Sequence, residues 1–419
     1  MTANGRADRR LEDGLELLAE PRFPDYLNDV LAVTSQRRQR PAWTFPGRWI
    51  PMVDLARRPA FAPALPWRAI TFVLVLLLIA AIALIAVGAP KRLPPPFGLA
   101  ANGAIPYSSN GDLYLGDPHG ASRLLLSGPE QDTDPGFSRS GPLLFFLRAE
   151  ASSGSIWTVH ADGTRVTRVT PPIADLGWID FGGSDDSLYY TAPENGVRRL
   201  HVVGTDGTTP PRVLAPDLKI DTVSFRPPDG REMLVRGETA AGIGLYVMNA
   251  DGSNRHTLVA PDRTDLEEHD FGDPRYSPDG KLVAYQHWDA TFDHMRMHVI
   301  GADGSNDHVV HFGPAVFEGW PVWLADSKQL VMQRAIPVPG EYLHFGYPFV
   351  VVNADGTGTA REIGPPIAGL HAELSPDGTK LLQFQDQGAT QIIIDIASGT
   401  YESVPWQSNS YPSWQRLAP

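Results

Sequence analysis

Short apolar runs alternate with polar turn residues along most of this chain. Five of these runs lead into an Asp-Gly pair and are followed by another short apolar run. Asp-Gly in this setting indicates a β-hairpin, because a tight hairpin turn needs positive φ angles, which glycine adopts at little cost. The turns recur every 44–52 residues and centre on Asp162, Asp206, Asp251, Asp303 and Asp355. An all-β pattern with such a period predicts the blades of a β-propeller.

A second pattern, x-Pro-x-aromatic, lies between the hairpins at residues 134–137, 273–276 and 320–323. A Ser-Pro-Asp-Gly turn follows at 277–280 and recurs at 375–378. Each unit then holds about four short strands, which is one propeller blade. The units begin near residues 105, 137, 178, 225, 274, 321 and 374. We therefore expect seven blades, or six if one irregular unit is a long loop.

The x-Pro-x-aromatic pattern occurs once more at residues 411–414, near the C-terminus. The first unit, which begins near residue 105, lacks this strand. We expect the C-terminal strand to complete the first blade and close the ring, which removes exposed sheet edges.

These repeats resemble the TolB-like, or PD40 (WD40-like), β-propeller family. The resemblance rests on an aromatic residue before Ser-Pro-Asp-Gly, then a strand, then Asn-x-Asp-Gly-Ser, and it covers residues 105–419. It implies the propeller fold. It does not imply one function, because related propellers serve as interaction modules, as parts of lipoproteins and as domains of peptidases.

An uncharged apolar segment at residues 69–89 precedes the propeller region. Its 21 residues would span about 30 Å as a helix, the thickness of a bilayer's hydrocarbon core. We therefore expect a single transmembrane helix, anchored in the membrane lipid bilayer. Four regions follow: an N-terminal segment at 1–68, the span at 69–89, a Pro-rich linker at 90–104 and the propeller at 105–419.

The charges around this segment predict its orientation. Residues 1–68 contain eleven Arg, no Lys and eight acidic residues, whereas the whole chain has a net charge of −13. Positive residues favour the cytoplasmic side of a membrane, so we expect a cytoplasmic N-terminus and an extracytoplasmic propeller at the cell membrane. The acidic propeller argues against a nucleic-acid partner. The chain has no cysteine, which excludes disulfides and thiolate chemistry.

The N-terminal segment contains two short patterns of helical period, at residues 10–20 and 24–39. Two such helices cannot bury a core of their own. One interpretation is a partly helical or disordered tail with basic residues near the lipid. The other is a docking segment, residues 1–66, that orders on a cytoplasmic regulator. The plan is similar to that of membrane anti-sigma factors, although their zinc motif is not found in this sequence.

Catalytic motifs are not found in the sequence. It contains no Gly-x-Ser-x-Gly, no His-Glu-x-x-His and no phosphate-binding glycine loop. We therefore expect a non-catalytic protein without a cofactor, which binds a protein, peptide or glycan. The alternatives are a membrane-anchored, anti-sigma-like regulator that signals through residues 1–66 and, third, a hydrolase or lyase on a propeller scaffold.

Candidate site residues fall into two groups. Five histidines cluster in one unit, and His294 and His298 would share one side of a strand, so they are weak candidates for a metal site with Asp289 or Asp293. Four tryptophans break the repeat pattern and are weak candidates for a ligand site at a channel mouth. They are Trp157, Trp178, Trp288 and Trp320. The Asp-Gly aspartates lack the ligand spacing of a calcium loop, so we expect them to bond within their own turns.

Overall fold

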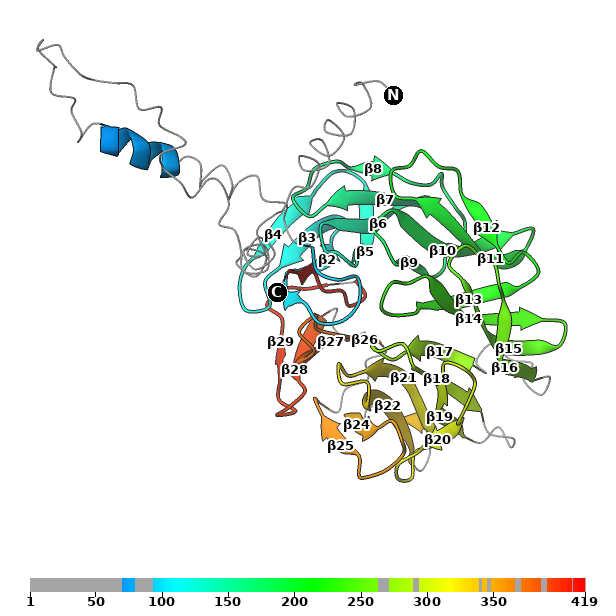
Figure 1. Ribbon diagram of the computed structural model, residues 1–419. Coiled ribbons are helices and arrows are strands. Elements are labelled where there is room, and N and C mark those ends of the chain that lie inside the picture. Colours follow the sequence, from blue (N-terminus) through cyan, green and yellow to red (C-terminus); the bar gives the residue numbers. More distant parts are fainter. Residues whose placement is uncertain are drawn as a thin grey trace, which may run out of the picture. The chain divides into compact units, whose positions relative to one another are not determined.

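The computed structural model describes residues 70–79 and 93–418, apart from 263–270, 289–293, 339–340, 345–347, 366–370, 386–389 and 409. The chain divides into two compact units, residues 1–89 and residues 90–419. The second unit consists of β-strands arranged as a propeller (Figure 1). The predicted N-terminal segment, including the docking residues 1–66, lies outside the described residues.

In the first unit, the described residues form one helix at 70–79. Such a helix rises about 15 Å, half of the hydrocarbon thickness of about 30 Å. Among the described residues, no helix is long and apolar enough to cross a membrane. This finding contradicts the predicted single-pass cell-membrane localisation with a transmembrane helix at 69–89. Residues 69 and 80–89 of the predicted span lie outside the described part.

The strands of the second unit form antiparallel meanders, in which neighbours in sequence are neighbours in a sheet. The first sheet has three strands, and those of residues 131–262 have four each. Their bounds are β2 (Ile105–Ser109), β3 (Asp112–Gly116), β4 (Ser122–Leu126); β5 (Gln131–Phe137), β6 (Leu143–Glu150), β7 (Ser153–His160), β8 (Thr167–Arg168); β9 (Ile179–Phe181), β10 (Ser187–Glu194), β11 (Val197–Gly204), β12 (Arg212–Leu214); β13 (Lys219–Phe225), β14 (Glu232–Thr239), β15 (Gly242–Asn249) and β16 (His256–Asp262).

The later strands form a nine-stranded sheet and a further four-stranded sheet. The nine-stranded sheet contains β17 (Phe271–Tyr276), β18 (Leu282–Trp288), β19 (Met295–Gly301), β20 (His308–Val310), β21 (Phe317–Trp323), β22 (Gln329–Val338), β23 (Glu341–His344), β24 (Phe349–Asn353) and β25 (Arg361–Ile363). The four-stranded sheet contains β26 (His371–Leu374), β27 (Lys380–Gln385), β28 (Thr390–Asp395) and β29 (Tyr401–Ser403).

Strand pairing confirms the all-β propeller but not the predicted count of seven blades. In the described residues, five sheets of three or four strands are separate blades, and β17–β25 are joined in one sheet. The joining contact is a single parallel pair, Met295 with Phe317, between β19 and β21.

The hydrophobic core lies between successive sheets. Leu200 of β11, for example, packs in one cluster with Phe225 and Met233 of the next sheet. Another cluster joins the first sheet to the last and contains Ile105, Leu382 and Trp414. Each large apolar side chain buried in this way contributes roughly 1.5–3 kcal/mol. The sheets therefore hold one another in a ring through their faces.

The ends of the propeller region meet, but not as predicted. Residues 411–414 are not a β-strand, and beside them the hydroxyl oxygen of Ser410 accepts a hydrogen bond of 2.8 Å from the backbone N of Ser108 in β2. Instead, β30 (Arg416–Leu417) pairs with β1 (Ala101–Asn102). The predicted closing strand is corrected to a short pair just beyond it, with the Trp414 side chain buried in the core.

Candidate functional site

The innermost strands surround a cavity of 920 Å³ on the axis of the ring. Figure 1 shows β5, β9, β13, β17, β21 and β26 closest to the centre. Each of these strands contributes residues to the cavity wall, as do residues 411–414. Concave sites of this size are where propellers and other proteins bind ligands.

A β-bulge recurs where the innermost strands begin. The register shifts between Thr133 and Gly136 in β5, and equivalent shifts occur in β17 and β21. The bulged residue precedes the motif's proline and has a positive φ angle: 48° at Asp134, 38° at Asp273 and 50° at Trp320. Proline is tolerated here because a bulge requires no ladder hydrogen bond from it. The bulges turn these residues toward the cavity, which they line.

Each innermost segment contains an aromatic residue or a leucine at an equivalent position: 137, 181, 225, 276, 323, 374 and 414. The residue immediately before this position lines the cavity in every segment. Ser224 Oγ accepts a hydrogen bond of 3.2 Å from the backbone N of Tyr276 in the next segment. Ser413 Oγ likewise accepts from the backbone N of Phe137 at 3.1 Å. We call these residues the median ring: Gly136, Asp180, Ser224, Arg275, Val322, Glu373 and Ser413.

Two acidic residues of the cavity wall, Asp180 and Glu373, have different environments. Arg139 binds the carboxylate of Asp180 at 2.6 Å and the backbone carbonyls of Phe181 and Gly182. Glu373 belongs to the same region, and its desolvation raises the pKa of its carboxyl to about 8. Nearby Asp180 raises this pKa further, whereas the guanidinium groups of Arg139 and Arg416 lower it. Glu373 is therefore mostly protonated and uncharged at neutral pH.

At the other end of the wall lie His371 and Tyr411. Their rings meet edge to face with centroids 4.7 Å apart. Burial lowers the pKa of His371, while Asp273 raises it and Arg275 lowers it. His371 is thus neutral at pH 7, and the two charged residues of β17 lie close enough to act on it.

The segment at residues 95–99, before β1, lies across the opposite end of the cavity. Arg416 donates hydrogen bonds to the carbonyls of Pro95 and Gly98, at 3.1 and 2.6 Å. The guanidinium of Arg139 lies over the Phe97 ring, 4.9 Å from the centroid of that ring. Residues 96–99 line the cavity together with the turns that follow β5, β13, β17 and β26. We refer to residues 95–99 as the plug.

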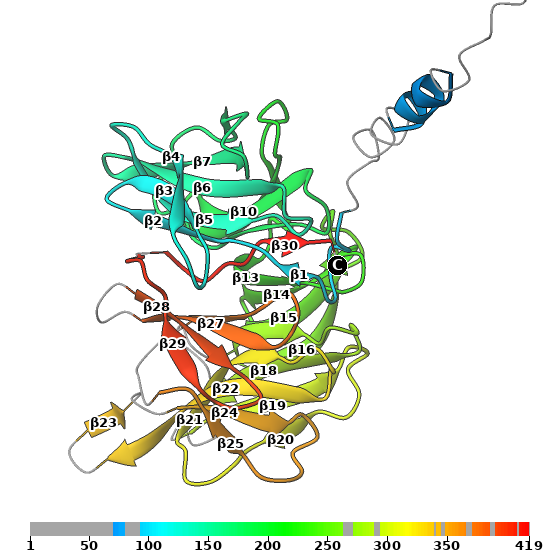
Figure 2. The same cartoon turned by 90° about the vertical axis from the view of Figure 1, so that its left-hand side faces the viewer.

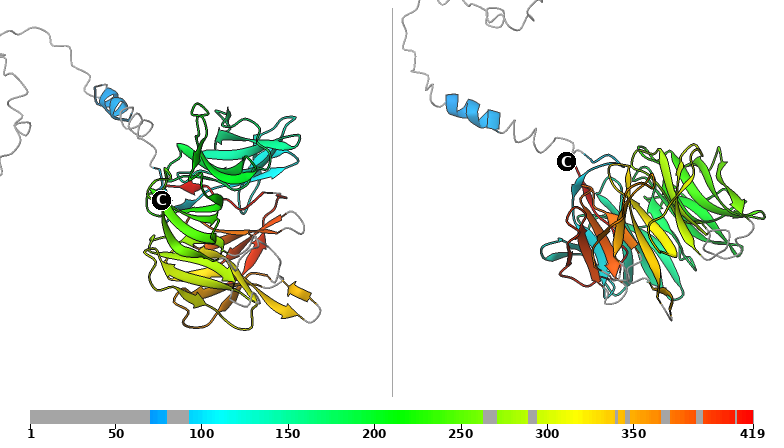
Figure 3. Two further views of the ribbon diagram at one scale, coloured as in Figure 1. Left: turned by 90° about the vertical axis from the view of Figure 1, so that its right-hand side faces the viewer. Right: turned by 90° about the horizontal axis from the view of Figure 1, so that it is seen from below.

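The two ends of the cavity lie on opposite faces of the ring. Figures 2 and 3 show β1 and β30 on one face and the projecting β22–β23 hairpin on the other. Phe317, at the start of β21, pairs with Ala335, so the hairpin lies at the end where the innermost strands begin. The plug is at the ends of these strands, and Trp320, His371 and Tyr411 are on the hairpin side.

The structure separates the four candidate tryptophans. Trp178 and Trp320 line the cavity. Trp157 does not, and the guanidinium of Arg148 lies over its ring, 4.5 Å from the ring centroid. Trp288 packs against the cluster of Met295, Phe317 and Ala335. Two of the four therefore have the position that a channel-mouth ligand site requires.

The histidine cluster does not form a metal site in the described part of the chain. His298 Nδ1 lies 3.2 Å from Oδ1 of Asp307, and Oδ2 of the same carboxylate accepts a hydrogen bond of 2.8 Å from the Tyr285 hydroxyl. His294 lies before β19, and no group of three possible ligands is found among the described residues. Asp289 and Asp293, the proposed carboxylate ligands, lie outside those residues.

The predicted role of the Asp-Gly aspartates is confirmed. Asp251 Oδ1 accepts hydrogen bonds from the backbone N and the hydroxyl of Ser253, at 2.8 and 2.5 Å. The same pair of bonds occurs at the other four turns, where the aspartates are Asp162, Asp206, Asp303 and Asp355. These contacts hold the turn and leave no reason to assign calcium.

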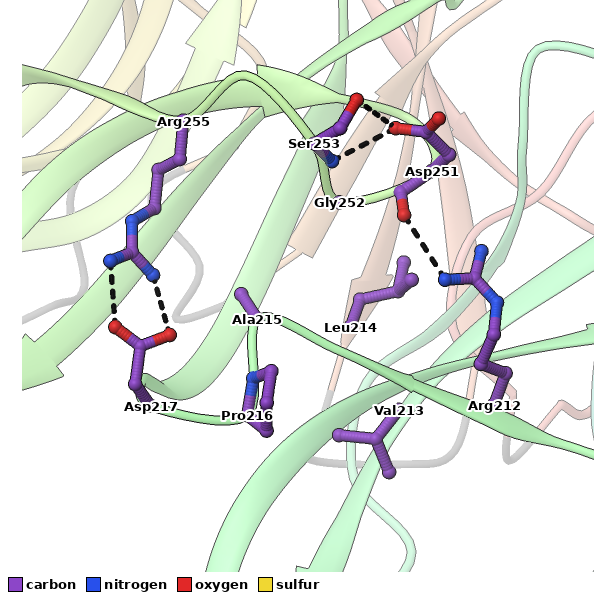
Figure 4. Close-up of a pocket in the computed structure, with 10 residues that line it drawn as sticks. All are labelled: Arg212, Val213, Leu214, Ala215, Pro216, Asp217, Asp251, Gly252, Ser253 and Arg255. Carbon is purple, nitrogen blue, oxygen red and sulfur yellow. Dashed lines mark hydrogen bonds and ion pairs between the residues drawn. The ribbon is translucent and has the colours of Figure 1, made fainter.

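A second hollow of 520 Å³ lies between β12 and the turn after β15 (Figure 4). Its charged groups are occupied within the protein. Arg255 binds both carboxylate oxygens of Asp217, at 2.8 and 2.6 Å, and Arg212 donates to the carbonyl of Asp251 at 3.2 Å. This contact recurs elsewhere: Arg123, His308 and Arg361 bond to the carbonyls of Ala161, Ala354 and Ile396, each in a later hairpin turn. The hollow is therefore part of the packing between sheets.

The comparisons with known proteins bear on the fold. No family model matches the sequence, and no curated protein matches it. An oligogalacturonate lyase in complex with manganese is similar, with 16% identity, a TM-score of 0.52, and 75% of this chain and 85% of that chain covered. A puromycin hydrolase S511A mutant matches with 13% identity, a TM-score of 0.53, and coverage of 77% and 55%.

TolB from Acinetobacter baumannii also matches, with 15% identity, a TM-score of 0.48, and coverage of 74% and 81%. A TolB thus occurs among the structural neighbours. At these identities the similarity concerns the fold, which binding proteins and enzymes share.

Sequence reasoning missed most of the cavity wall. Arg139, Arg275, Glu373 and the plug residue Phe97 were not among the candidates, although all line the cavity. Aligning the repeats on their aromatic position supplies the missing signal for two of them. Arg275 and Glu373 then fall where other units carry Gly136, Ser224 and Ser413, so a large charged residue stands out.

Proposed function

We propose that this propeller is a non-catalytic binding protein, which takes part of a protein, peptide or glycan into its central cavity from the hairpin side. The main support is the cavity itself, whose wall combines aromatic rings with a few polar groups, as ligand sites generally do. Trp178, Trp320 and Tyr411 provide the aromatic surface toward the hairpin side. Tyr411 is 57% exposed, so its ring is available for contact.

The fold supports this proposal through its rigidity. A ring of packed sheets presents groups from segments far apart in sequence at one fixed place. In this view, the nine-stranded sheet serves as two blades, β17–β20 and β21–β25, which together with the other five sheets would make seven. Apart from the plug, seven innermost segments line the cavity, namely β5, β9, β13, β17, β21, β26 and residues 411–414, which agrees with that count.

The experiment is a ligand screen with the full chain. A random peptide library and a glycan array are tested, and the affinity of each hit is measured by calorimetry. Tyr411→Ala should weaken binding about tenfold or more, since an aromatic hot spot contributes about 2 kcal/mol or more and about 1.4 kcal/mol is tenfold in affinity. Tyr401→Ala is the matched control, because Tyr401 is 52% exposed on the outer strand β29. Equal losses in both variants, or no binder in either screen, would refute the proposal.

A hydrolase or lyase is the second candidate, and Glu373 favours it. A carboxyl with a pKa of about 8 inside a cavity has the property that a general acid needs at neutral pH. This candidate predicts that the full chain turns over a ligand found in the screen and that Glu373→Gln abolishes turnover while binding persists. Recovery of every bound ligand unchanged after prolonged incubation would remove the candidate.

A further inference from the structure

One arginine of the cavity wall, Arg275, has a guanidinium without a partner within the described residues. Arg275 of β17 is exposed, although it belongs to the cavity wall. Within the described residues, its guanidinium forms neither an ion pair nor a hydrogen bond. The other arginines of the wall differ, because Arg139 is bound to Asp180, and Arg416 to the carbonyls of Arg139 and the plug. Arg275 therefore retains its full capacity to bind an anion.

The backbone beneath Arg275 is held in place. Its carbonyl accepts a hydrogen bond of 3.0 Å from the indole Nε1 of Trp323, in the neighbouring segment. On the other side, the next residue, Tyr276, donates its backbone N–H to Ser224 Oγ. Ser224 thus lies beside Arg275 in the median ring. Because its oxygen accepts this bond, its own hydroxyl proton can be donated, and no such donated bond exists within the described residues.

The charges around Arg275 permit an anion to approach. Glu373 is mostly protonated at neutral pH, and the carboxylate of Asp180 is neutralised by Arg139. His371 is neutral at pH 7, since burial lowers its pKa. Two carboxylates remain on the wall: Asp273, two residues before Arg275, and Asp134, the bulged residue of β5. An arginine binds a carboxylate through two parallel hydrogen bonds, a geometry that a serine hydroxyl can supplement.

The plug limits what can reach this place. A polymer that threads through the ring would need both ends of the cavity open. One end is covered by the plug, which Arg416 holds through the carbonyls of residues 95 and 98. Next to the plug, the backbone N of Ala100 donates a hydrogen bond of 2.8 Å to the carbonyl of Pro376. A chain that enters from the hairpin side must therefore present its end. The wall on that side includes the apolar side chains of Leu147, Leu176 and Ile179, which suit an apolar residue better than a sugar.

We infer that the cavity binds the C-terminal end of a peptide, with its carboxylate on Arg275 and Ser224 and its last side chain against the apolar wall. This inference rests on the proposed binding function and specifies its ligand. Capture of a C-terminal carboxylate is a common way to recognise a chain end, because this group occurs once in each chain.

The test uses the full chain and a random peptide library displayed with free C-termini. A selected peptide is synthesised as the free acid and as the C-terminal amide, and the affinity of each is measured by calorimetry. We expect the amide to bind at least tenfold more weakly. Arg275→Gln should weaken binding of the acid to the same degree, so that acid and amide bind with equal affinity. Arg275→Lys should restore part of the difference in affinity. Arg231→Gln is the matched control, because the Arg231 side chain is 87% exposed and lies outside the cavity.

Equal affinities of acid and amide, or binding of the acid that Arg275→Gln does not change, would overturn the inference. If such binding is still lost in Tyr411→Ala, the cavity binds a ligand in another way and the proposed function survives. Binders found only among acidic glycans would overturn the peptide as ligand. Peptides and glycans that all fail to bind would refute the proposed function and this inference with it. Circular dichroism of each variant checks that the fold is intact.

Discussion

The guanidinium of Arg139 lies 4.9 Å from the centroid of the Phe97 ring. This contact joins the plug to the turn after β5, and Asp180 holds the guanidinium from its other side at 2.6 Å. Phe97, in the segment before β1, thereby contacts the ion pair of Arg139 and Asp180 in the cavity wall. The plug is an integral part of the propeller.

Replacing Phe97 by alanine should loosen the plug. We expect a loss of about 2 kcal/mol in the free energy of unfolding, since a half-buried aromatic ring and a cation–π contact are removed. Urea unfolding followed by circular dichroism measures the loss. Leu93→Ala is the control, because Leu93 is 60% exposed and should give no change. Equal stability of Phe97→Ala and the parent chain would show that the plug contributes nothing.

Glu373 should make stability depend on pH. Desolvation raises the pKa of its carboxyl from 4.5 to about 8, so the folded protein retains a proton that the unfolded chain has released. Stability contributed by this group is then complete below pH 4.5 and falls as the pH rises to about 8. Glu373→Gln imitates the protonated acid. The variant should match the parent near pH 4 and melt at a higher temperature at pH 8. A constant difference in melting temperature from pH 5 to 8 would contradict the raised pKa.

The buried ion pair of Asp132 and Arg148 should be costly to break. Asp132 is 3% exposed, and its two oxygens bind Arg148 at 2.7 and 2.8 Å. Asp132→Ala leaves a guanidinium without its partner, so we expect a loss of about 3–5 kcal/mol in unfolding experiments. The double variant Asp132→Leu with Arg148→Met removes both charges and should recover much of this loss. A double variant as unstable as the single one would show that packing, and not charge, is responsible.

The contacts between outer strands and neighbouring sheets should stabilise the ring. Arg361 of β25 donates a hydrogen bond of 2.8 Å to the carbonyl of Ile396 in the last sheet. Arg361→Met keeps the length of the side chain and removes the bond, at a cost of about 1 kcal/mol. Arg231→Met serves as the control on an 87% exposed side chain. Thermal melting of both variants checks the prediction, which requires a lower midpoint for Arg361→Met alone.

The sequence was informative where a local rule determines the structure. Asp-Gly turns follow from the φ angle of glycine and the bonds of one aspartate, so hairpins such as that at Asp251 were predicted correctly. The bulges at Asp134, Asp273 and Trp320 were read as plain strand, because nothing in the x-Pro pattern alone indicates a shift of register.

Other features depend on contacts between distant residues and were predicted poorly. The plug residue Phe97 contacts Arg139 and packs against the core cluster that contains Phe225, and a repeat pattern connects it to neither. Nor could Arg275 be recognised as unpaired before its neighbours were known. The apolar run at 69–89 predicted a membrane span, whereas the described helix covers residues 70–79.

The pairing of β1 with β30 has a consequence for biosynthesis. While the ribosome is still translating, the earlier sheets can stack on one another as they emerge, but the first sheet has no partner on its open side. Trp414 and residues 416–417 must be synthesised before that side is covered. Until then, Ile105 and Tyr107 present apolar surface to the cell, and a nascent chain stalled before this point would be a natural substrate for chaperones.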